Sequence, residues 1–225
     1  VLEAASIASV ADATVSGIHM DRDIAAKLGK TLEDARTTAF VTLRLQHGAD
    51  ITDKVLASPT QLRELLFTKW GLPVVELTDT GNPSTDKATL HELALSDPRA
   101  GLIHAYRDAA YCKAKFSVSP VASMDYNEEV DVSHPAPRIF GTYTGRMTYS
   151  SKTGRGREEK PTGVALHQWK RDKLYRQMIT VPDGYDLLEF DFAGQEFRWM
   201  AVESGDETMM ELCMPGEDAH GFMGA

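Results

Sequence analysis

The stretch that most constrains how this chain can fold lies at 187–202, where one hydrophobic pattern replaces another. Residues 187–192 read Leu-Leu-Glu-Phe-Asp-Phe, a bulky apolar run that is typical of a buried β-strand. From Glu196 onward the apolar residues are spaced as on one face of a helix. The pattern predicts a strand that ends at Asp191, a turn at 193–194, and then a helix.

Asp191 is the candidate functional residue of this stretch. A carboxylate at the end of a strand is held by a rigid element and stays open on one side, which suits a hard cation such as Mg²⁺. The alternative is that Asp191 only caps the helix that follows. The local pattern by itself favours the cap, so the choice depends on the surrounding motif.

Residues 191–198 read Asp-Phe-Ala-Gly-Gln-Glu-Phe-Arg, which resembles the first palm motif of family A DNA polymerases, Asp-Tyr-Ser-Gln-Ile-Glu-Leu-Arg. These polymerases are the relatives of bacterial DNA polymerase I. The register continues through further family motifs: Arg-Gln at 176–177, Pro-Asp-Gly-Tyr at 182–185, Arg-x-x-Ala at 198–201, Ser-Gly-Asp at 204–206 and Asp-Ala-His at 218–220. The loose form of the first motif fits a divergent bacteriophage enzyme better than a housekeeping repair polymerase.

The preceding segment resembles the helical thumb of the same family. The motifs Ser-Pro-x-Gln-Leu, Leu-Phe, Gly-Leu-Pro, Pro-Ser-Thr and Tyr-Arg occur between 58 and 107 in the family order. Each motif alone is typical of an ordinary helix start or stop, such as Ser58 as an N-cap before Pro59. Ordinary helix boundaries do not explain why all the motifs follow the family order. We expect helices at about 2–18, 21–48, 58–70, 90–95 and 102–116, and a loop or crossing connection at 117–137.

The resemblance implies an α+β fold, in which a helical thumb is followed by part of the antiparallel-sheet palm of a right-hand polymerase. The implied divisions are a palm-associated entry helix at 1–20, the thumb at 21–137, a palm segment with the first catalytic motif at 138–205 and the start of the fingers at 206–225. The β-like composition of 138–150 agrees with the start of a sheet.

The charge distribution favours a nucleic-acid partner in spite of a net charge of −9. From Arg138 to Arg176 there are ten Lys and Arg side chains against three acids, and a basic segment in an acidic protein is typical of a phosphate-contacting surface. For the four cations at 152–160, a solvated loop is the better interpretation.

The cysteines and the apolar runs bear on the compartment. Only Cys112 and Cys213 occur, without ligand-like spacing, so we expect a reducing cytosol and no disulfide framework. No apolar run has the length of a membrane span, and no membrane partner is expected. The prediction is a cytoplasmic protein, which would act in the bacterial host if the gene belongs to a phage.

The resemblance also implies which residues hold the metal and the nucleotide. Asp191 would bridge two Mg²⁺ ions, and the main-chain carbonyl of Phe192 would coordinate the nucleotide-bound ion. Glu196 would be the steric gate, with its side chain where a ribose 2′ hydroxyl would go; the alternative is a first-turn glutamate favoured by the helix dipole. His220 would approach the triphosphate, and its alternative is a surface histidine near a helix start.

Gln195 departs from the family, which usually has Ile at this position beside the steric gate. An amide can exchange hydrogen bonds with the nucleotide sugar or with the minor-groove edge of the base. The hypothesis that follows is that Gln195 alters nucleotide preference.

The DNA-side candidates are polar and basic residues in the matching motifs: Lys113, Thr144, Arg146, His167, Gln168, Arg171 and Arg176. The planar fork of arginine donates several hydrogen bonds without losing its charge, which suits phosphate and minor-groove contacts. His167 and Gln168 are departures from the family motif Leu-Gln-Asn-Ile-Pro-x-Arg, and one residue is missing there. For Lys113 and the nearby Lys115, a solvated helix face is at least as good an interpretation.

The sequence stops where the family continues into the fingers, and before the second palm motif with its carboxylate. Two-metal phosphoryl transfer needs that carboxylate. We therefore expect the chain to add deoxynucleotides from dNTP to primer-template DNA only together with the fingers and the second palm motif, with an exonuclease domain as an optional further segment. The alternative is a non-catalytic nucleic-acid-binding module derived from a polymerase thumb and palm. A metal-dependent nuclease or phosphatase is the weakest interpretation, because no second carboxylate motif accompanies Asp191.

Overall fold

The structure is a computed structural model of the chain. It describes residues 10–127, 130–138, 142–144, 146–150, 152–153, 160–161, 164–189, 192–214, 216–217 and 221. The chain forms two compact units, Val1–Tyr185 and Asp186–Ala225. Helices dominate the first unit and small antiparallel sheets complete it, as the predicted α+β fold requires.

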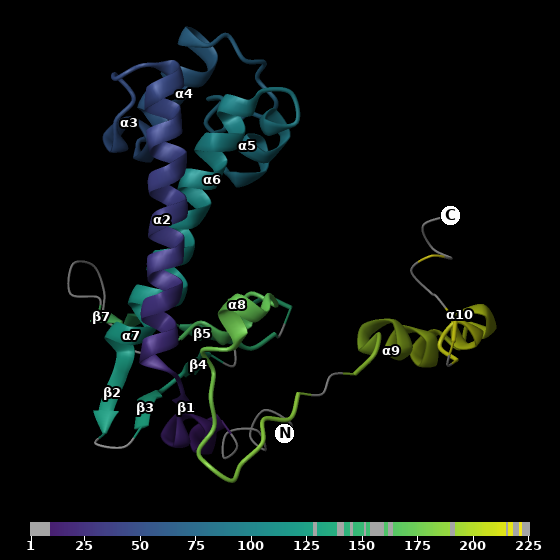
Figure 1. Cartoon of the computed structure of the whole chain (residues 1–225). Coiled ribbons are helices and arrows are strands. Elements are labelled where there is room, and N and C mark those ends of the chain that lie inside the picture. The colour runs from purple at the N-terminus through teal and green to yellow at the C-terminus, as the bar shows by residue number, and fades with distance from the viewer. Residues whose placement is uncertain are drawn as a thin grey trace. The chain divides into compact units, whose positions relative to one another are not determined.

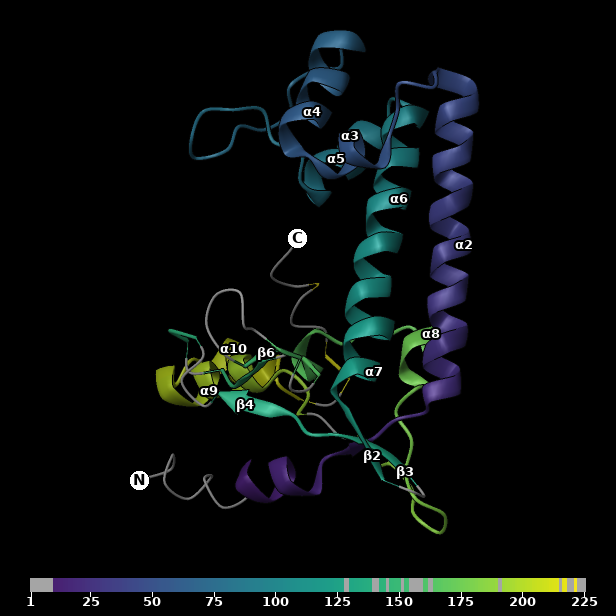
Figure 2. The ribbon, with the colours of Figure 1, turned by 90° about the vertical axis from the view of Figure 1, so that its left-hand side faces the viewer.

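Two long helices form the axis of the first unit (Figure 1 and Figure 2). Helix α2 (Arg22–His47) begins after Asp21, whose side chain accepts a hydrogen bond from the N–H of Ile24 at 2.7 Å, and it ends at Gly48. Helix α6 (Pro98–Lys113) runs antiparallel beside it. The expected helix at 21–48 is confirmed, because its start and stop signals are local. Neither of these helices nor any other described helix is long and apolar enough to cross a membrane.

Short helices pack at one end of the α2–α6 pair (Figure 1). They are α3 (Asp53–Ala57), α4 (Pro59–Arg63), the π-helical turn η1 (Glu64–Lys69) and α5 (Lys87–Ala94). Ser58 caps α4, as predicted, by accepting a hydrogen bond from the N–H of Gln61 at 3.4 Å. The apolar sides of these helices share one core with α2 and α6: Leu43, Ile51, Leu56, Leu62, Leu66, Leu90 and Ile103. Each such buried side chain stabilises the fold by about 2 kcal/mol.

Two π-helical turns interrupt helices that the sequence predicted as regular ones. The turn η1 extends α4, and η2 (Ala114–Val118) extends α6 before α7 (Ser119–Ser123). In η2 the buried Ser117 donates a hydrogen bond from its Oγ to the main-chain oxygen of Ala25 at 2.8 Å. This contact ties η2 to α2, and hydrophobic periodicity does not encode it.

A three-stranded antiparallel sheet lies at the other end of the helix pair, in the order β1–β3–β2 (Figure 2). Its strands are β1 (Ile18–His19), β2 (Met124–Asn127) and β3 (Val130–Ser133). The loop expected at 117–137 is therefore wrong. The strands there are short: β2 and β3 pair with each other along their whole length, and β1, which lies far earlier in the sequence, pairs with the end of β3. Arg22 of α2 also holds β3 through two hydrogen bonds to Asp131, at 2.8 and 3.0 Å.

Two further strand pairs follow in the first unit. Strand β4 (Ala136–Arg138) pairs with β5 (Thr148–Ser150), and β6 (Lys152–Thr153) pairs with β7 (Lys160–Pro161). The β-like composition at 138–150 is thus reflected in β4 and β5. After them come the 3₁₀ turn η4 (Leu166–Gln168) and the short helix α8 (Lys173–Arg176).

The second unit carries α9 (Gln195–Ser204) and α10 (Glu207–Glu211). The helix predicted after the turn is confirmed, but the strand predicted before it is wrong for the part that the structure describes, because Phe190 and Asp191 lie outside the described residues. Residues 185–189 form no strand, and Leu187 and Leu188 are 65% and 81% exposed. A strand persists only where a neighbouring strand satisfies its main-chain hydrogen bonds, and no segment that the structure describes pairs with this one.

Candidate nucleotide and nucleic-acid sites

The start of α9 carries the residues predicted to hold metal and nucleotide. Asp191 and His220 lie outside the described residues. The N-cap position of α9 is Gly194, in the left-handed region at φ 61°, and glycine has no side chain with which to cap a helix. The Nε of Arg198 donates a hydrogen bond to the main-chain oxygen of Ala193 at 2.8 Å and closes this turn. The N-cap position of α9 among the described residues thus carries no capping side chain.

Gln195 and Glu196 stand in the first turn of α9, and both are exposed, as is Phe192. A pocket of about 750 Å³ opens beside them, lined by Phe192, Ala193, Gln195, Arg198, Trp199 and Val202. The amide of Gln195 is therefore accessible to a ligand. The position of Glu196 also agrees with a first-turn glutamate favoured by the helix dipole, so its function as a steric gate stays a prediction.

The described residues do not supply a complete magnesium site. Among them, no group of three or more His, Cys, Asp or Glu side chains lies together in a way that could hold a metal ion. Mg²⁺ takes oxygen ligands in near-octahedral geometry, usually from one or two carboxylates. The carboxylate of Asp191 and the main-chain carbonyl of Phe192 are ligands of the right type, but they are too few by themselves.

His167 and Gln168 lie together on η4, and both are exposed. The Oε1 of Gln168 accepts a hydrogen bond from the Nζ of Lys115. The Nδ1 of His167 accepts one from the main-chain N–H of Tyr149 at 3.1 Å. The Nζ of Lys115 also donates to the hydroxyl of Tyr111 at 2.9 Å. The structure thus brings two predicted DNA-side residues into contact with η2 and β5.

The imidazole of His167 is held in one state by this arrangement. Although the residue as a whole is exposed, partial desolvation of its ring, and then the positive charge of Lys115, lower the pKa of His167 below its ordinary value, so the neutral ring predominates at neutral pH. Its ring stacks on that of Tyr149, with centroids 6.2 Å apart. Sequence reasoning missed Tyr149 because no local pattern relates it to His167. Of the neighbours of this turn, only Lys115 could be noticed in the sequence, as a cation near Lys113.

The other DNA-side candidates lie on separate elements. The Oγ1 of Thr144 is 3.1 Å from the Oγ1 of Thr142, which also donates to the main-chain oxygen of Arg146 at 3.0 Å. Arg171 is exposed, and Arg176 is partly buried on α8. Their contacts with DNA stay predictions.

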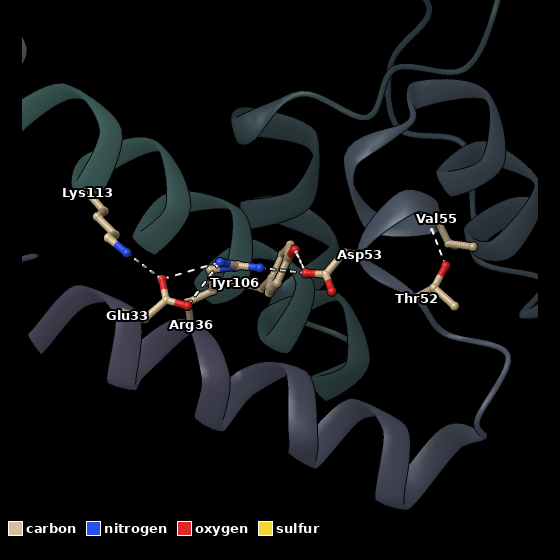
Figure 3. Close-up of polar contacts among 7 residues, drawn as sticks. All are labelled: Glu33, Arg36, Thr52, Asp53, Val55, Tyr106 and Lys113. Carbon is tan, nitrogen blue, oxygen red and sulfur yellow. Dashed lines mark hydrogen bonds and ion pairs between the residues drawn. The ribbon is translucent and has the colours of Figure 1, made fainter. Parts of the chain in front are cut away.

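Lys113 takes part in a chain of polar contacts between helices (Figure 3). Its Nζ donates a hydrogen bond to Glu33 of α2 at 3.1 Å. Glu33 also pairs with Arg36, which reaches Asp53 of α3 at 2.6 Å. Asp53 in turn accepts a hydrogen bond from the hydroxyl of Tyr106 at 2.5 Å. Lys113 is therefore drawn toward α2, and its contact with DNA also stays a prediction.

The sequence is similar to those of known DNA polymerases. The family model described as DNA polymerase family A matches residues 23–225. The chain is 30% identical over 170 residues to DNA polymerase I of Pseudomonas aeruginosa, which covers 73% of this chain and 17% of that protein. It is 30% identical over 157 residues to the DNA polymerase of Escherichia phage T5, which covers 69% of this chain and 17% of that protein. The chain thus spans only a small part of the length of these relatives.

A solved structure shares the fold. The chain resembles the POL domain of Pol1 from M. smegmatis, solved in complex with DNA primer-template and dNTP, with a TM-score of 0.74 and 24% sequence identity. The similarity covers 95% of this chain and 35% of that chain. The helices and small antiparallel sheets described above are therefore those of part of a polymerase domain.

Proposed function

Because the chain belongs to DNA polymerase family A, we propose that it forms part of a DNA-directed DNA polymerase that adds deoxynucleotides to a primer 3′ end. The observation that carries this proposal is the family match across residues 23–225, which includes the motif at 191–198. We assign 21–137 to the thumb, 1–20 and 138–205 to the palm, and 206–225 to the start of the fingers.

The nucleotide site is proposed at the start of α9. Asp191 and the main-chain carbonyl of Phe192 would hold two Mg²⁺ ions, together with a second carboxylate from outside this chain. When bound, two such metal ions stabilise the attacking and leaving oxygens of phosphoryl transfer. Glu196 would exclude a ribose 2′ hydroxyl, and Gln195, exposed beside it in the pocket at Phe192, would contact the nucleotide sugar or base. His220 would approach the triphosphate.

The DNA site is proposed in the first unit. Its residues would position the duplex largely without regard to sequence, through phosphate and groove contacts: Lys113, Thr144, Arg146, His167, Gln168, Arg171 and Arg176. The exposure of His167, Gln168 and Arg171 supports this assignment. The solved POL domain of similar fold also supports it, because that structure is a complex with DNA primer-template and dNTP.

The partners would be primer-template DNA, a dNTP and the remaining polymerase segments. The chain covers 17% of its Pseudomonas and phage T5 relatives, so most of such a polymerase lies outside these residues. We propose that the fingers and the second palm motif must be present for nucleotide addition.

Complementation tests the proposed function. The chain is mixed with the fingers and second palm motif of the same polymerase, and extension of a labelled primer is followed with and without Mg²⁺. Extension should require Mg²⁺ and both polypeptides, and Asp191→Ala should abolish it because a metal ligand is lost. Asp79→Ala, in an exposed turn of the first unit, is the matched control and should extend normally. Undiminished extension by Asp191→Ala would contradict the proposal.

A non-catalytic nucleic-acid-binding module is the second candidate. It is favoured by one observation: the contacts of Gln168 with Lys115 and of His167 with Tyr149 hold two exposed polar side chains together on η4. Such a module would bind primer-template with the same salt dependence in wild type and in Asp191→Ala, and no added segment would restore extension.

A further inference from the structure

The segment 71–86, between η1 and α5, forms a hairpin that projects from the short helices of the first unit (Figure 2). Leu77 and Pro83 face each other across it in an antiparallel bridge. The N–H groups of Thr78 and Ser84 donate main-chain hydrogen bonds of 2.8 Å across the hairpin, one on each side of the bridge. The 71–86 hairpin therefore has a defined register.

Both ends of the hairpin are fixed to the helices. Leu72 packs against the core that these helices share, and its N–H donates to the main-chain oxygen of Leu66 at 3.0 Å. At the other end, Arg107 of α6 donates a hydrogen bond to the main-chain oxygen of Thr85 at 2.6 Å. The hairpin thus presents its surface from a firm base.

One side of the hairpin has unused main-chain groups. Where hydrogen bonds flank an antiparallel bridge in this way, the N–H and C=O of the bridged residues point away from the partner strand. Leu77 therefore turns these groups to its outer side, whereas Pro83 has no N–H to offer on the opposite side. In the described part of the chain, no hydrogen bond uses the main chain of 73–75 or of Leu77. We call the outer side of 73–77 the open edge.

The side chains along the open edge are largely apolar and exposed. Val74, Val75 and Leu77 are 50%, 38% and 60% exposed. Valine favours an extended, paired strand, and an exposed apolar strand with free main-chain groups is a template on which another strand can pair. The open edge therefore has the properties of a surface for strand addition.

The charge of the hairpin indicates which kind of partner it accepts. Residues 71–86 contain three acids and no lysine or arginine, so their formal charge is −3: Glu76, Asp79 and Asp86. Such a segment repels DNA phosphates, and it also repels a second copy of itself. A polypeptide with basic side chains is attracted to it.

We propose that the open edge of the 71–86 hairpin is a docking surface for an extended, basic segment of a partner protein, which adds to the hairpin as a third strand. Main-chain hydrogen bonds to Leu77 and Val75 would hold the added strand, and its cations would face the acids of the hairpin. The proposal uses none of the residues assigned above to metal, nucleotide or DNA, so it does not rest on the proposed function.

A pair of synthetic peptides tests the proposal. The first is a fluorescent peptide of about seven residues, an ordinary strand length, that alternates lysine with valine. The second has the same side chains and charge, but methyl groups replace the hydrogens of its main-chain nitrogens. Fluorescence anisotropy measures the binding of each peptide to the whole chain. The methylated peptide should bind at least about tenfold more weakly, because it cannot donate main-chain hydrogen bonds.

Variants of the hairpin locate the binding site. Leu77→Lys places a cation on the open edge and removes an apolar contact, so it should weaken binding of the first peptide by about tenfold. Leu77→Val keeps an apolar strand former and should keep the wild-type affinity. Leu45→Lys is the matched control, because Leu45 is an 82% exposed leucine of α2. Urea denaturation confirms that each variant is folded.

The other occupants of the open edge give different results. Equal affinity for the two peptides, or unchanged affinity in Leu77→Lys, overturns the proposal, since charge alone would then explain the binding. Displacement of the peptide by primer-template DNA assigns the edge to DNA and also overturns it. Self-association of the chain that Leu77→Lys abolishes, measured by analytical ultracentrifugation, assigns the edge to a second copy with the same consequence. Primer extension in the complementation experiment does not depend on any of these results.

Discussion

At the scale of single residues, the contacts around Asp53 show how a charged network joins three helices (Figure 3). The hydrogen bond from Tyr106, and then that from Arg36, lower the pKa of Asp53 below its ordinary value of 3.8. Lys113, with a further contribution from Arg36, lowers the pKa of Glu33. Both carboxylates therefore stabilise the fold while they are ionised.

The pH dependence of stability follows from the sign of these shifts. A carboxylate whose pKa is lower in the folded state stabilises it above the unfolded pKa, and this stabilisation is lost as pH falls through the folded value. Asp53→Asn should lower the free energy of unfolding at pH 7 by about 0.5–1 kcal/mol, as for an exposed ion pair. It should also flatten the loss of stability below about pH 4, measured by thermal unfolding from pH 7 to pH 3.

Asp79→Asn, in an exposed turn outside this network, is the control and should follow the wild-type curve. Identical losses of stability on acidification in wild type and in Asp53→Asn would show that the network does not contribute.

At the scale of elements, the approach of η2 to α2 depends on a glycine. A Cβ added at Gly29 would lie 2.4 Å from the Oγ of Ser117, which is fixed by its hydrogen bond to Ala25. Replacing a helical glycine by alanine normally stabilises a helix by about 1 kcal/mol. At this position the steric clash outweighs that gain, because a buried and bonded oxygen has little room to move.

Gly29→Ala should therefore lower the free energy of unfolding by about 1–3 kcal/mol, the usual range for overpacking, as measured by urea denaturation. Gly101→Ala in α6 is the matched control: its new Cβ would meet Ala94 at an ordinary 3.6 Å, so it should be neutral or stabilising. Adding Ser117→Ala to Gly29→Ala should recover part of the loss. Equal stabilisation by the two alanine substitutions would contradict this account of the helix contact.

At the scale of the whole molecule, the two units differ in how they bury apolar residues. The first unit has three buried clusters, whereas in α9 only Ala201 is buried. Many large apolar side chains of the second unit are exposed: Leu187, Leu188, Phe192, Trp199, Met200 and Val202. Such exposure is typical of a surface that packs against another polypeptide segment, which agrees with the proposed need for the remaining polymerase segments.

The fluorescence of Trp199 tests this difference. Trp199 is 60% exposed, whereas Trp70 and Trp169 are partly buried. Acrylamide should quench Trp199 most strongly, and Trp199→Phe should remove the most accessible component of the emission. Adding the missing fingers and palm segments should protect Trp199 from quenching, with Trp199→Phe as the control. Unchanged quenching after complementation would show that α9 does not pack against those segments.

The sequence by itself determined the features whose signals are local. Helix α2 begins at Asp21 and ends at Gly48, and Ser58 caps α4, because a cap needs only the few residues beside it. The family motifs also identified the polymerase fold. The functions of Asp191 and His220 were predicted in the same way and stay predictions, because these two residues lie outside the described part of the chain.

Only the tertiary structure decided the features that join distant parts of the chain. Strand β3 lies in the middle of a sheet because β1, from far earlier in the chain, pairs with it opposite β2, whereas residues 185–189 form no strand, since no described segment pairs with them. Lys115 and Gln168 are 53 positions apart, and their contact orients an amide that the sequence shows only as a departure from a motif. Pairing and donor orientation depend on which groups meet in space, and local spacing carries no information about that.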